Sequence, residues 1–456
     1  MATAVKASRT FPGGVHPPER KGLTEDSAIQ PAPVPKQLSI LLSQHLGAVC
    51  RPLVAKKDAV RAGQKIGEAD AFVSAPVHSS LNGVVKDISL QPHPVLGRTE
   101  GIIIDVDAEN AGARQPRADQ FSGDFDINQF SDTQILDAVG EAGIVGMGGA
   151  GFPTRVKLQP NPTKPIKTMI VNGCECEPFI TCDYRIMLEW TGQIIAGIQL
   201  VKKVLKPERC IIGIEDNKPE AIEAMSRAVS GSDGIEVVSL KTKYPQGGER
   251  QLIKSIIDRD VPTPGIPPMI SVLVVNVATA AAIAEAVVFN EPLTHRVVTV
   301  TGPGVQRPGN FYTPIGMAVG ELIEACGGLK SDAVKVILGG PMMGISIADL
   351  SCPITKTSGA ITVLDAKEIG RAKVEMRQTA CIRCGRCIEA CPMNLNPTKI
   401  AHAVKHGLLD VAEDYHQSAC IECGCCSYVC PANIELTGYI RTGKMAVAKR
   451  KRQETK

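Results

Sequence analysis

Two stretches near the C-terminal end of the chain carry the same pattern of cysteines. CIRCGRCIEACP, which starts at Cys381, and CIECGCCSYVCP, which starts at Cys420, both have the form C-x-x-C-x-x-C-x-x-x-C-P. Nine of the sixteen cysteines lie in this region, so the cysteines are concentrated there. Three cysteines with two residues between each pair can bind one cubane cluster only if the chain forms a tight loop. This spacing is typical of [4Fe–4S] ligands. Gly385 and Gly424 ease that turn, and the chain is predicted to hold two [4Fe–4S] clusters.

The fourth cysteine of each motif lies beyond the reach of the cluster held by the first three, so it is expected to ligate the other cluster. The predicted ligand sets are Cys381, Cys384, Cys387 and Cys430 for one cluster, and Cys420, Cys423, Cys426 and Cys391 for the other. Zinc sites also use four thiolates, but usually as two separated C-x-x-C pairs, so the repeated triple spacing favours iron and sulfide. Cys425 is expected to be a small buried residue and not a ligand.

Length and charge exclude several classes of protein. With 456 residues, 44% of them apolar, the chain is long enough for three or more domains. Its formal net charge of +3 is nearly balanced and predicts no nucleic-acid partner. Residues 1–14 contain no apolar signal-peptide core, so the chain is expected to stay in the cytoplasm. The apolar run 269–289 contains Asn276, Thr279 and Glu285, which predicts a buried strand followed by a helix and not a membrane span.

The stretch GIVGMGGAGFPTRVKL, residues 143–158, contains G-x-G-x-x-G at Gly146, Gly148 and Gly151. In a Rossmann unit this motif follows a strand and opens a helix. Here the preceding segment predicts a helix capped by Ser131 or Asp132, and a plausible buried strand comes only later. The motif is therefore not a Rossmann fingerprint, and a flexible glycine turn is the alternative to a nucleotide site.

Four segments together resemble the flavin- and NADH-binding subunit of respiratory complex I: GMGGAGFPT, VNGCECEPFITCDYR, YPQGGERQL and VVNVAT. The resemblance implies an α/β fold whose glycine-rich loop binds FMN and whose exposed flavin face meets NADH. It assigns flavin contacts to Gly146, Gly148, Gly149 and Asn172, and a nicotinamide or adenine contact to Phe152. The other site positions are Gly151, Glu175, Glu177, Tyr244, Gly247, Glu249, Asn276 and Thr279. Lys157 adds a cation suited to phosphate, which the backbone N–H groups of glycines can approach closely.

Four positions depart from the family pattern. Met147 replaces an arginine of the family pattern, and Cys174 replaces an aspartate. Gly248 replaces a glutamate, and Val275 replaces an asparagine. A less polar pocket is expected to alter the flavin potential or the orientation of the nucleotide. Cys174, Cys176 and Cys182 lack a fourth ligand nearby, so ordinary packing is expected there in preference to a metal site.

The flanking segments resemble the RnfC subunit of the Rnf electron-transport complex over essentially the whole chain. They include FPGGVHPPERKGLTE, residues 11–25, and KKDAVRAGQKIGEADAFVSAPVHSSLNGVV, which is built like a lipoyl or biotinyl carrier domain with short strands between glycines. Its hairpin EADAFVSAP has no acceptor lysine, so we expect a docking domain without covalent lipoylation. Residues 295–365 resemble the β-grasp, soluble-ligand-binding module that follows the flavin fold in complex I.

The predicted fold class is multidomain α+β. The expected parts are an N-terminal arm (1–32), a β-rich barrel-sandwich (lipoyl-like) domain (33–110), an α/β FMN/NADH-binding domain (125–294), a β-grasp module (295–365), an α-helical double-cluster ferredoxin domain (370–445) and a basic tail (446–456). The tail is expected to be a solvated end, with an acidic partner or anionic lipid as the alternative.

The resemblance implies a peripheral subunit on the cytoplasmic face of the cell membrane, bound to integral membrane and iron–sulfur subunits of an Rnf-type complex. It would exchange hydride between NADH or NAD and FMN and pass single electrons through two [4Fe–4S] clusters. Partner subunits would couple this flow to ion translocation and, indirectly, to ferredoxin. Two alternatives are a cobalamin-reductase-like flavoprotein, against which FPGGVHP and the carrier-like domain argue, and an iron–sulfur relay subunit that has lost flavin.

Overall fold

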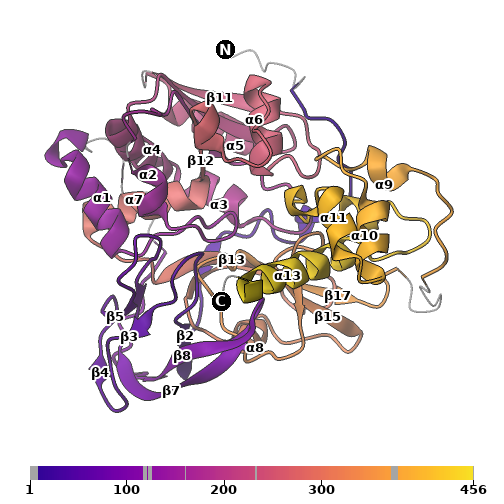
Figure 1. The fold of residues 1–456 in the computed structure, drawn as a ribbon. Helices are drawn as coiled ribbons and strands as arrows, with labels where there is room; N and C mark the ends of the chain where they lie inside the picture. Colours follow the sequence, from indigo (N-terminus) through magenta and orange to yellow (C-terminus); the bar gives the residue numbers. More distant parts are fainter. Residues whose placement is uncertain are drawn as a thin grey trace.

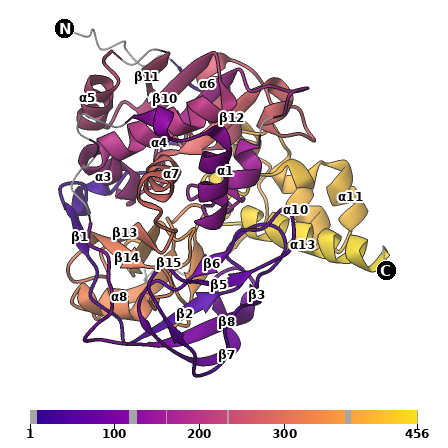
Figure 2. The same ribbon diagram turned by 90° about the vertical axis from the view of Figure 1, so that its left-hand side faces the viewer.

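The computed structural model describes residues 9–116, 121, 126–159, 161–231, 234–370 and 378–454 (Figure 1). A β-rich domain, an α/β domain and a second β-rich module pack together, and a helical C-terminal module lies against one side of them. Figure 2 shows the long last helix of that module extending outward to the C-terminal end. Short 3₁₀ turns occur at Lys21–Leu23, Ile127–Gln129, Pro267–Ile270 and Gln417–Ala419.

The first domain contains two small antiparallel sheets, with strand orders β2-β8-β7-β4 and β3-β5-β6. Its strands are β2 (Gln37–Leu41), β3 (Arg51–Pro52), β4 (Ala59–Val60), β5 (Lys65–Glu68), β6 (Val77–His78), β7 (Gly83–His93) and β8 (Gly97–Val106). Leu38 and Ile40 alternate along β2 and are fully buried with Ile66 in one core, as strands with one buried face require. The predicted barrel-sandwich architecture is confirmed.

His78 in β6 provides a test of how this domain depends on pH. Burial, together with the charges of Lys356 and Lys65, lowers the pKa of His78 to about 3. An unfolded histidine titrates near 6.5, so between pH 6.5 and 3 the unfolded chain binds a proton that the folded chain does not. Stability is therefore expected to fall as the pH drops below about 6.5.

His78→Asn is expected to reduce this acid sensitivity, because the variant has no group to protonate on unfolding. The measurement is the drop in thermal unfolding midpoint between pH 7.5 and 5.5, which should be smaller by a few degrees, on the scale of about 1 kcal/mol. The exposed His406 offers a matched control, since His406→Asn should keep the native drop. An unchanged drop in His78→Asn would contradict the prediction.

The second domain is a parallel sheet with the strand order β11-β10-β9-β12. Its strands are β9 (Thr168–Asn172), β10 (Arg209–Glu215), β11 (Ile235–Leu240) and β12 (Val272–Asn276). Its helices are α1 (Asp132–Glu141), α2 (Thr154–Leu158), α3 (Cys182–Glu189), α4 (Thr191–Leu205), α5 (Pro219–Ala228), α6 (Glu249–Ile257) and α7 (Val277–Phe289). Ile170 and Val171 of β9 belong to different apolar clusters, so both faces of the sheet are covered.

The strand order of this sheet positions a site. From β9 the chain runs outward to β10 and β11 and then returns to place β12 on the other side of β9. Ligands bind at such a reversal, in the crevice beyond the carboxyl ends of the strands, here between β9 and β12. The predicted strand and helix in 269–289 are confirmed as β12 and α7. Within the described residues, no helix is long and apolar enough to cross a membrane.

The third module has a six-stranded sheet of order β1-β14-β13-β17-β15-β16. Its elements are β1 (Ile29–Pro31), β13 (His295–Thr301), β14 (Gly309–Pro314), α8 (Val319–Ala325), β15 (Ala333–Leu338), β16 (Ile345–Ile347) and β17 (Ala360–Asp365). β1 comes from the predicted N-terminal arm and pairs in parallel with β14. The described part of the arm thus contributes a strand at the edge of the β-grasp sheet.

The C-terminal module is helical, as predicted. Its helices are α9 (Arg386–Glu389), α10 (Pro397–Lys405), α11 (Leu409–Asp414), α12 (Cys425–Tyr428) and α13 (Leu436–Glu454). In the described part of the basic tail, through Glu454, α13 continues, and Lys449, Lys451 and Gln453 are exposed. Arg450 pairs with Asp410 and Glu413 at 2.8 and 2.6 Å, and Lys451 pairs with Glu413 at 2.6 Å, so acidic groups of α11 neutralise these charges.

The beginning of the chain joins the helical module to the α/β domain. Val15 and Tyr244 form an antiparallel bridge with backbone hydrogen bonds of 2.8 and 2.9 Å. The N–H of Gly14 donates to the carbonyl of Ala390 at 3.0 Å. Gly13 has a φ of 72°, and a Cβ there would lie 2.8 Å from the carbonyl oxygen of Cys391, so the approach requires glycine.

Candidate functional site

The glycine-rich segment forms a narrow loop between α1 and α2. An isolated antiparallel bridge joins Val145 to Pro153, and the N–H of Gly146 donates to the carbonyl of Phe152 at 2.9 Å. These contacts close the base of the loop and leave its tip, residues 148–150, exposed. The helix predicted before the motif is present, so the segment is not a Rossmann strand–turn–helix.

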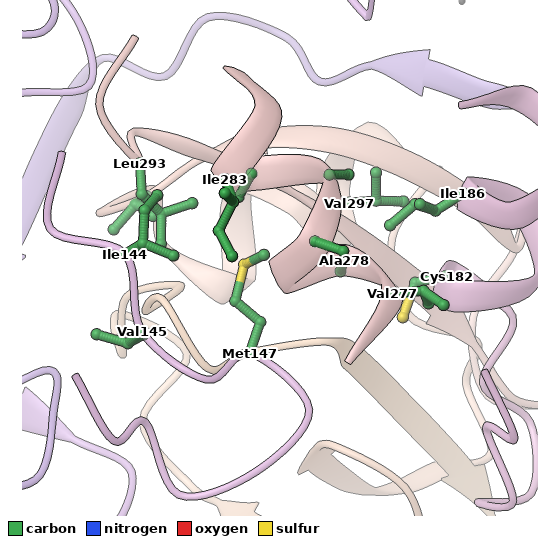
Figure 3. Packing of buried hydrophobic residues seen from close by; sticks show 14 of the residues in the cluster. Ile144, Val145, Met147, Cys182, Ile186, Val277, Ala278, Ile283, Leu293 and Val297 are labelled. Atoms are coloured by element: carbon green, nitrogen blue, oxygen red, sulfur yellow. The ribbon is translucent and has the colours of Figure 1, made fainter. Parts of the chain in front are cut away.

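Met147 fixes the loop on α7. Its N–H donates to the hydroxyl of Thr279 at 3.0 Å, and its side chain is buried. Figure 3 shows that side chain among Ala278 and Ile283 of α7. The substitution of methionine for the family's arginine therefore adds to the core under the loop. Thr279, predicted to line the site, acts in this structure as an acceptor for the loop backbone.

The tip of the loop has room above it. A Cβ on Gly148 would lie 2.8 Å from the side-chain nitrogen of Asn276, so this residue must be glycine for the loop to approach β12. A Cβ on Gly149 would have no atom within 4 Å. Within the described residues, the N–H groups of Gly148, Gly149 and Ala150 have no protein acceptor. Free N–H groups beside open space fit the phosphate of FMN.

Asn172 and Asn276 lie side by side at the reversal of the sheet. They end β9 and β12 and are register partners in the parallel ladder. The Asn276 amide donates to a carboxylate oxygen of Asp183 at 2.6 Å, and its carbonyl oxygen caps α7. The Asn172 amide donates to the carbonyl of Gly247 at 2.9 Å. The structure thus brings Asn172, Gly247, Asn276 and the glycine loop together at the carboxyl ends of β9 and β12.

Three further predicted residues lie around the ends of α2 and α6. Lys157 of α2 pairs with Glu249, the first residue of α6, at 3.1 Å. Both side chains are partly exposed, so the ammonium is accessible to an incoming phosphate. Phe152 is 37% exposed, and an aromatic face open to solvent can receive a nicotinamide or adenine ring.

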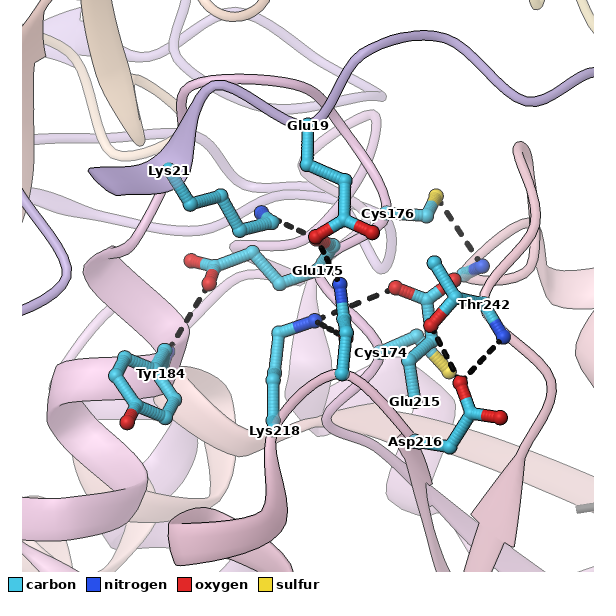
Figure 4. A network of polar contacts seen from close by, with 12 residues as sticks. Glu19, Lys21, Cys174, Glu175, Cys176, Tyr184, Glu215, Asp216, Lys218 and Thr242 are labelled. Atoms are coloured by element: carbon cyan, nitrogen blue, oxygen red, sulfur yellow. Dashed lines mark hydrogen bonds and ion pairs between the residues drawn. The ribbon is translucent and has the colours of Figure 1, made fainter. Parts of the chain in front are cut away.

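Glu175 organises the turn after β9. Its carboxylate accepts from the N–H groups of Asp183 and Tyr184 at 2.6 and 3.2 Å, at the N-terminus of α3 (Figure 4). Burial raises the pKa of this carboxyl. The buried Lys21 donates to three carbonyls of segment 175–180 at 2.6 to 3.1 Å. The sequence does not identify Lys21 as a site residue, because nothing in its local pattern marks a lysine that acts on a turn more than 150 residues away.

Glu177 faces other modules and not the glycine loop. Its carboxylate accepts from the N–H groups of Met342 and Met343 at 3.2 and 2.8 Å and from the Tyr244 hydroxyl at 3.4 Å. Burial raises the pKa of Glu177 to about 7. The Tyr244 hydroxyl also donates to the carbonyl of Cys423 at 2.8 Å. Both residues thus join the β-grasp and cluster modules to the flavin domain, a role that the resemblance did not assign to them.

The cysteines between β9 and α3 pack separately. The Cys174 thiol is buried 3.6 Å from the carbonyl of Gly213, and the Cys176 sulfur accepts from the N–H of Gly247 at 3.3 Å. Among the described residues, neither Cys174 nor Cys176 belongs to a group of neighbouring side chains that could hold a metal ion, whereas Cys182 lies in such a group with Glu175 and Asp183.

One predicted cluster site is a cavity in the helical module. Its lining includes Cys391, Cys420, Cys423 and Cys426, together with apolar residues such as Leu395. The fourth cysteine of the first motif therefore lies with three cysteines of the second motif, as crossover ligation requires. This donor set of four cysteines fits a [4Fe–4S] cluster.

The other predicted set lies closer to the surface. Cys387 and Cys430 share an apolar cluster, whereas Cys381 and Cys384 are exposed. The two motifs repeat each other in detail. Gly385 and Gly424 have φ angles of 80° and 83°, and the N–H two residues after the first cysteine donates to its sulfur at 3.4 Å in one motif and 3.3 Å in the other. We call the buried set the inner cluster site and the other the outer cluster site.

Cys425 adjoins the inner cluster site. It is fully buried and packs with Val15 and Tyr244 in the apolar contact between modules. Its thiol lies 4.0 Å from the backbone carbonyl of Tyr244. Its expected role as a small buried residue agrees with this position.

Four family models match consecutive parts of the chain. They are the RnfC barrel sandwich hybrid domain (residues 9–109), the Nuo51 FMN-binding domain (139–285), the SLBB domain (297–346) and the 4Fe-4S dicluster domain (380–434). Their order agrees with the four folded units. A NAD+-reducing [NiFe]-hydrogenase in the air-oxidized state aligns with 63% of this chain and 54% of its own, at 21% identity and a TM-score of 0.47, too remote to add to the assignment.

Relatives match along most of the chain. The C subunit of the proton-translocating ferredoxin:NAD(+) oxidoreductase complex of Clostridium ljungdahlii is 43% identical over 86% of this chain and 84% of the relative. The C subunit of the Na(+)-translocating complex of Acetobacterium woodii is 38% identical over 89% of both chains. The C subunit of the ion-translocating oxidoreductase complex of Pseudomonas aeruginosa is 38% identical over 87% of this chain, which spans half of that longer relative. The chain therefore belongs to the family of RnfC subunits of Rnf ion-translocating ferredoxin:NAD oxidoreductase complexes and contains its FMN-binding and 4Fe-4S dicluster domains.

Proposed function

We propose that this protein exchanges hydride between NADH or NAD and FMN at the glycine loop, and that single electrons then pass between the flavin, the inner cluster and the outer cluster in that order. Bound FMN supplies the change from two-electron to one-electron transfer. The chain supplies binding, orientation and the spacing of the cofactors. No side chain needs to act as a nucleophile or general base.

The residues of the crevice have separate tasks in this proposal. The N–H groups of the loop tip bind the flavin phosphate, with Lys157 adding a positive charge. Asn172 and Asn276 orient the flavin at the reversal of the sheet, and Phe152 receives a ring of the dinucleotide. The proposed cofactor-binding set is Gly146, Gly148, Gly149, Gly151, Phe152, Lys157, Asn172, Gly247, Glu249, Asn276 and Thr279. Glu175, Glu177 and Tyr244 support this site from the side of the other modules.

One contact supports the proposal that the inner cluster lies between the flavin and the outer cluster. The Tyr244 hydroxyl lies 2.8 Å from the carbonyl oxygen of Cys423, a ligand of the inner site. On the flavin side, Gly247 is three residues from Tyr244 and bonds to Asn172 and to Cys176. A continuous run of bonded groups thus connects the flavin crevice with the inner site. The outer site has exposed cysteines and is suited to exchange electrons with a partner.

The outer site also suggests where partners bind. Ile382 and Ile388 are 66% and 44% exposed beside the outer ligands, and Arg383 and Arg386 lie in the same motif. We assign this face to an iron–sulfur subunit of the complex, which relays electrons indirectly to or from ferredoxin. The protein would then lie at the cytoplasmic face of the membrane, attached to the integral membrane subunits.

Tyr244→Phe tests the route. Loss of the hydroxyl removes one hydrogen bond of about 1 kcal/mol beside the inner cluster, which should lower its reduction potential by at most about 40 mV. A hydrogen-bond donor near the cluster stabilises its reduced state, which carries more negative charge, so loss of the donor lowers the reduction potential. Anaerobic NADH titration followed by electron paramagnetic resonance measures the reduction potential of the inner cluster. Flavin reduction should be unchanged.

Tyr428→Phe is the matched control, because Tyr428 belongs to the same module and is 49% exposed. It should leave both potentials at their native values. A shift confined to the outer cluster in Tyr244→Phe, or reduction of the outer cluster by NADH when the inner cluster is absent, would contradict the proposed order.

A further inference from the structure

A buried lysine joins three parts of the molecule beneath the glycine loop. Lys356, in the β-grasp module, is 1% exposed. Its ammonium donates to the carbonyl of Pro76 in the barrel-sandwich domain at 2.6 Å and to the carbonyl of Gly143 at 2.7 Å. Its backbone N–H donates to the side-chain oxygen of Gln44 at 3.0 Å. Gly143 is the turn from which the glycine loop begins, with a φ of 66°.

The neighbouring residues hold the other end of the same loop. A Cβ on Gly151 would lie 2.9 Å from the methyl group of Thr357 and 3.2 Å from the carbonyl oxygen of Gln44. The N–H of Leu46 donates to the carbonyl of Gly151 at 3.1 Å. Segments of the barrel-sandwich domain and the β-grasp module therefore clamp both ends of the loop, while its tip stays free.

The ammonium has no acidic partner. Among the described residues, no carboxylate lies within hydrogen-bond distance of it, and the titratable groups around it are His45, His78 and Cys50. Burial lowers the pKa of Lys356 to about 7, and burial and the lysine together lower the pKa of both histidines. A buried charge normally requires a partner, so an unpaired one under an anion-binding loop calls for a ligand that compensates it.

We infer that Lys356 is a positioning residue for the flavin site: its ammonium holds the first turn of the glycine loop in the flavin-binding geometry and places a positive charge at the base of the loop. The inference rests on the proposed flavin site. It explains why the loop depends on two domains outside the α/β fold. Lys356 contacts the loop backbone and acts through it.

The test uses the full-length protein with both clusters present and its flavin removed. FMN binding is measured by fluorescence quenching at pH 7 to 9 for the native chain, Lys356→Met and the exposed Lys367→Met as a matched control. Lys356→Met should raise the FMN dissociation constant about tenfold or more at pH 7, as expected for the loss of hydrogen bonds from a charged donor. The native protein and Lys367→Met should bind FMN less tightly as the pH rises, because the ammonium loses its charge. Lys356→Met should lack this dependence.

Native affinity and an unchanged pH profile in Lys356→Met would overturn the inference, as would a lower thermal midpoint without any loss of affinity. If Lys356→Met does not fold, Gln44→Leu removes the acceptor for the Lys356 backbone and should weaken FMN binding about threefold or more. Gly149→Val separates the two proposals. If Gly149→Val binds FMN normally, the proposed flavin site is wrong. If Gly149→Val loses FMN but Lys356→Met binds it normally, the flavin site stands and only the proposed role of Lys356 is wrong.

Discussion

Gly149→Val is expected to abolish stoichiometric flavin binding while both iron–sulfur clusters remain. A Cβ at this position meets no protein atom within 4 Å, so the valine enters the space above the loop without disturbing the fold. The φ angle of Gly149 is not in the left-handed region, so the backbone accepts valine without strain. In the presence of FMN the same side chain occupies the space that the flavin needs. Overpacking of this kind corresponds to about a hundredfold loss of affinity.

Flavin content, iron content and NADH-driven cluster reduction measure the result. Gly22→Val, at an exposed glycine that also has no positive φ, is the matched control and should keep flavin. Gly148→Val is a poor substitute, because its side chain would collide with Asn276 and damage the protein itself. Stoichiometric flavin with normal cluster reduction in Gly149→Val would mean that the loop is only a turn.

Replacement of either crossover ligand should remove one cluster. Cys391→Ala is expected to destroy the inner cluster, because Cys391 lines the same cavity as Cys420, Cys423 and Cys426. Cys430→Ala is expected to destroy the outer cluster. Each variant should fall from about eight irons per chain to about four. In Cys391→Ala, NADH should still reduce the flavin but should not reach the outer cluster.

Cys425→Ala provides the control, because Cys425 adjoins a ligand but packs against Tyr244. It should retain about eight irons. Metal analysis and electron paramagnetic resonance after anaerobic preparation separate the outcomes. Zinc in place of iron would refute the cluster assignment, and loss of the inner signal in Cys430→Ala would show that the crossover is wrong.

The cluster ligands could be predicted from sequence because ligation is local. Three cysteines of each set lie within seven residues, and the glycine that permits their turn is among them. The barrel-sandwich, flavin and β-grasp units were predicted in another way, from the resemblance of their segments to known families. The strand and helix in 269–289 followed from local patterns.

Residues that join the units were not recognisable. Lys21 acts on carbonyls 154 to 159 residues away, Tyr244 on a carbonyl 179 residues away and Lys356 on one 213 residues away. The N-terminal arm becomes a strand only because β14 offers an open edge, and the basic tail becomes helix beside acidic groups of α11. The resemblance places Glu177 among the site positions, and only the tertiary structure shows that the loop at Met342 and Met343 supplies hydrogen-bond donors to its carboxylate.

The sequence alone therefore predicted the ligands of two iron–sulfur clusters, because these lie close together along the chain, while the flavin and the units that hold the cofactors were predicted from resemblance to known families. The tertiary structure decided which set of cysteines lies beside Tyr244, which carboxylates face other modules and which lysine contacts the turn before the glycine loop. These depend on how separate units pack. A buried charge or hydroxyl finds its partner wherever packing excludes water, and no local pattern records where that is.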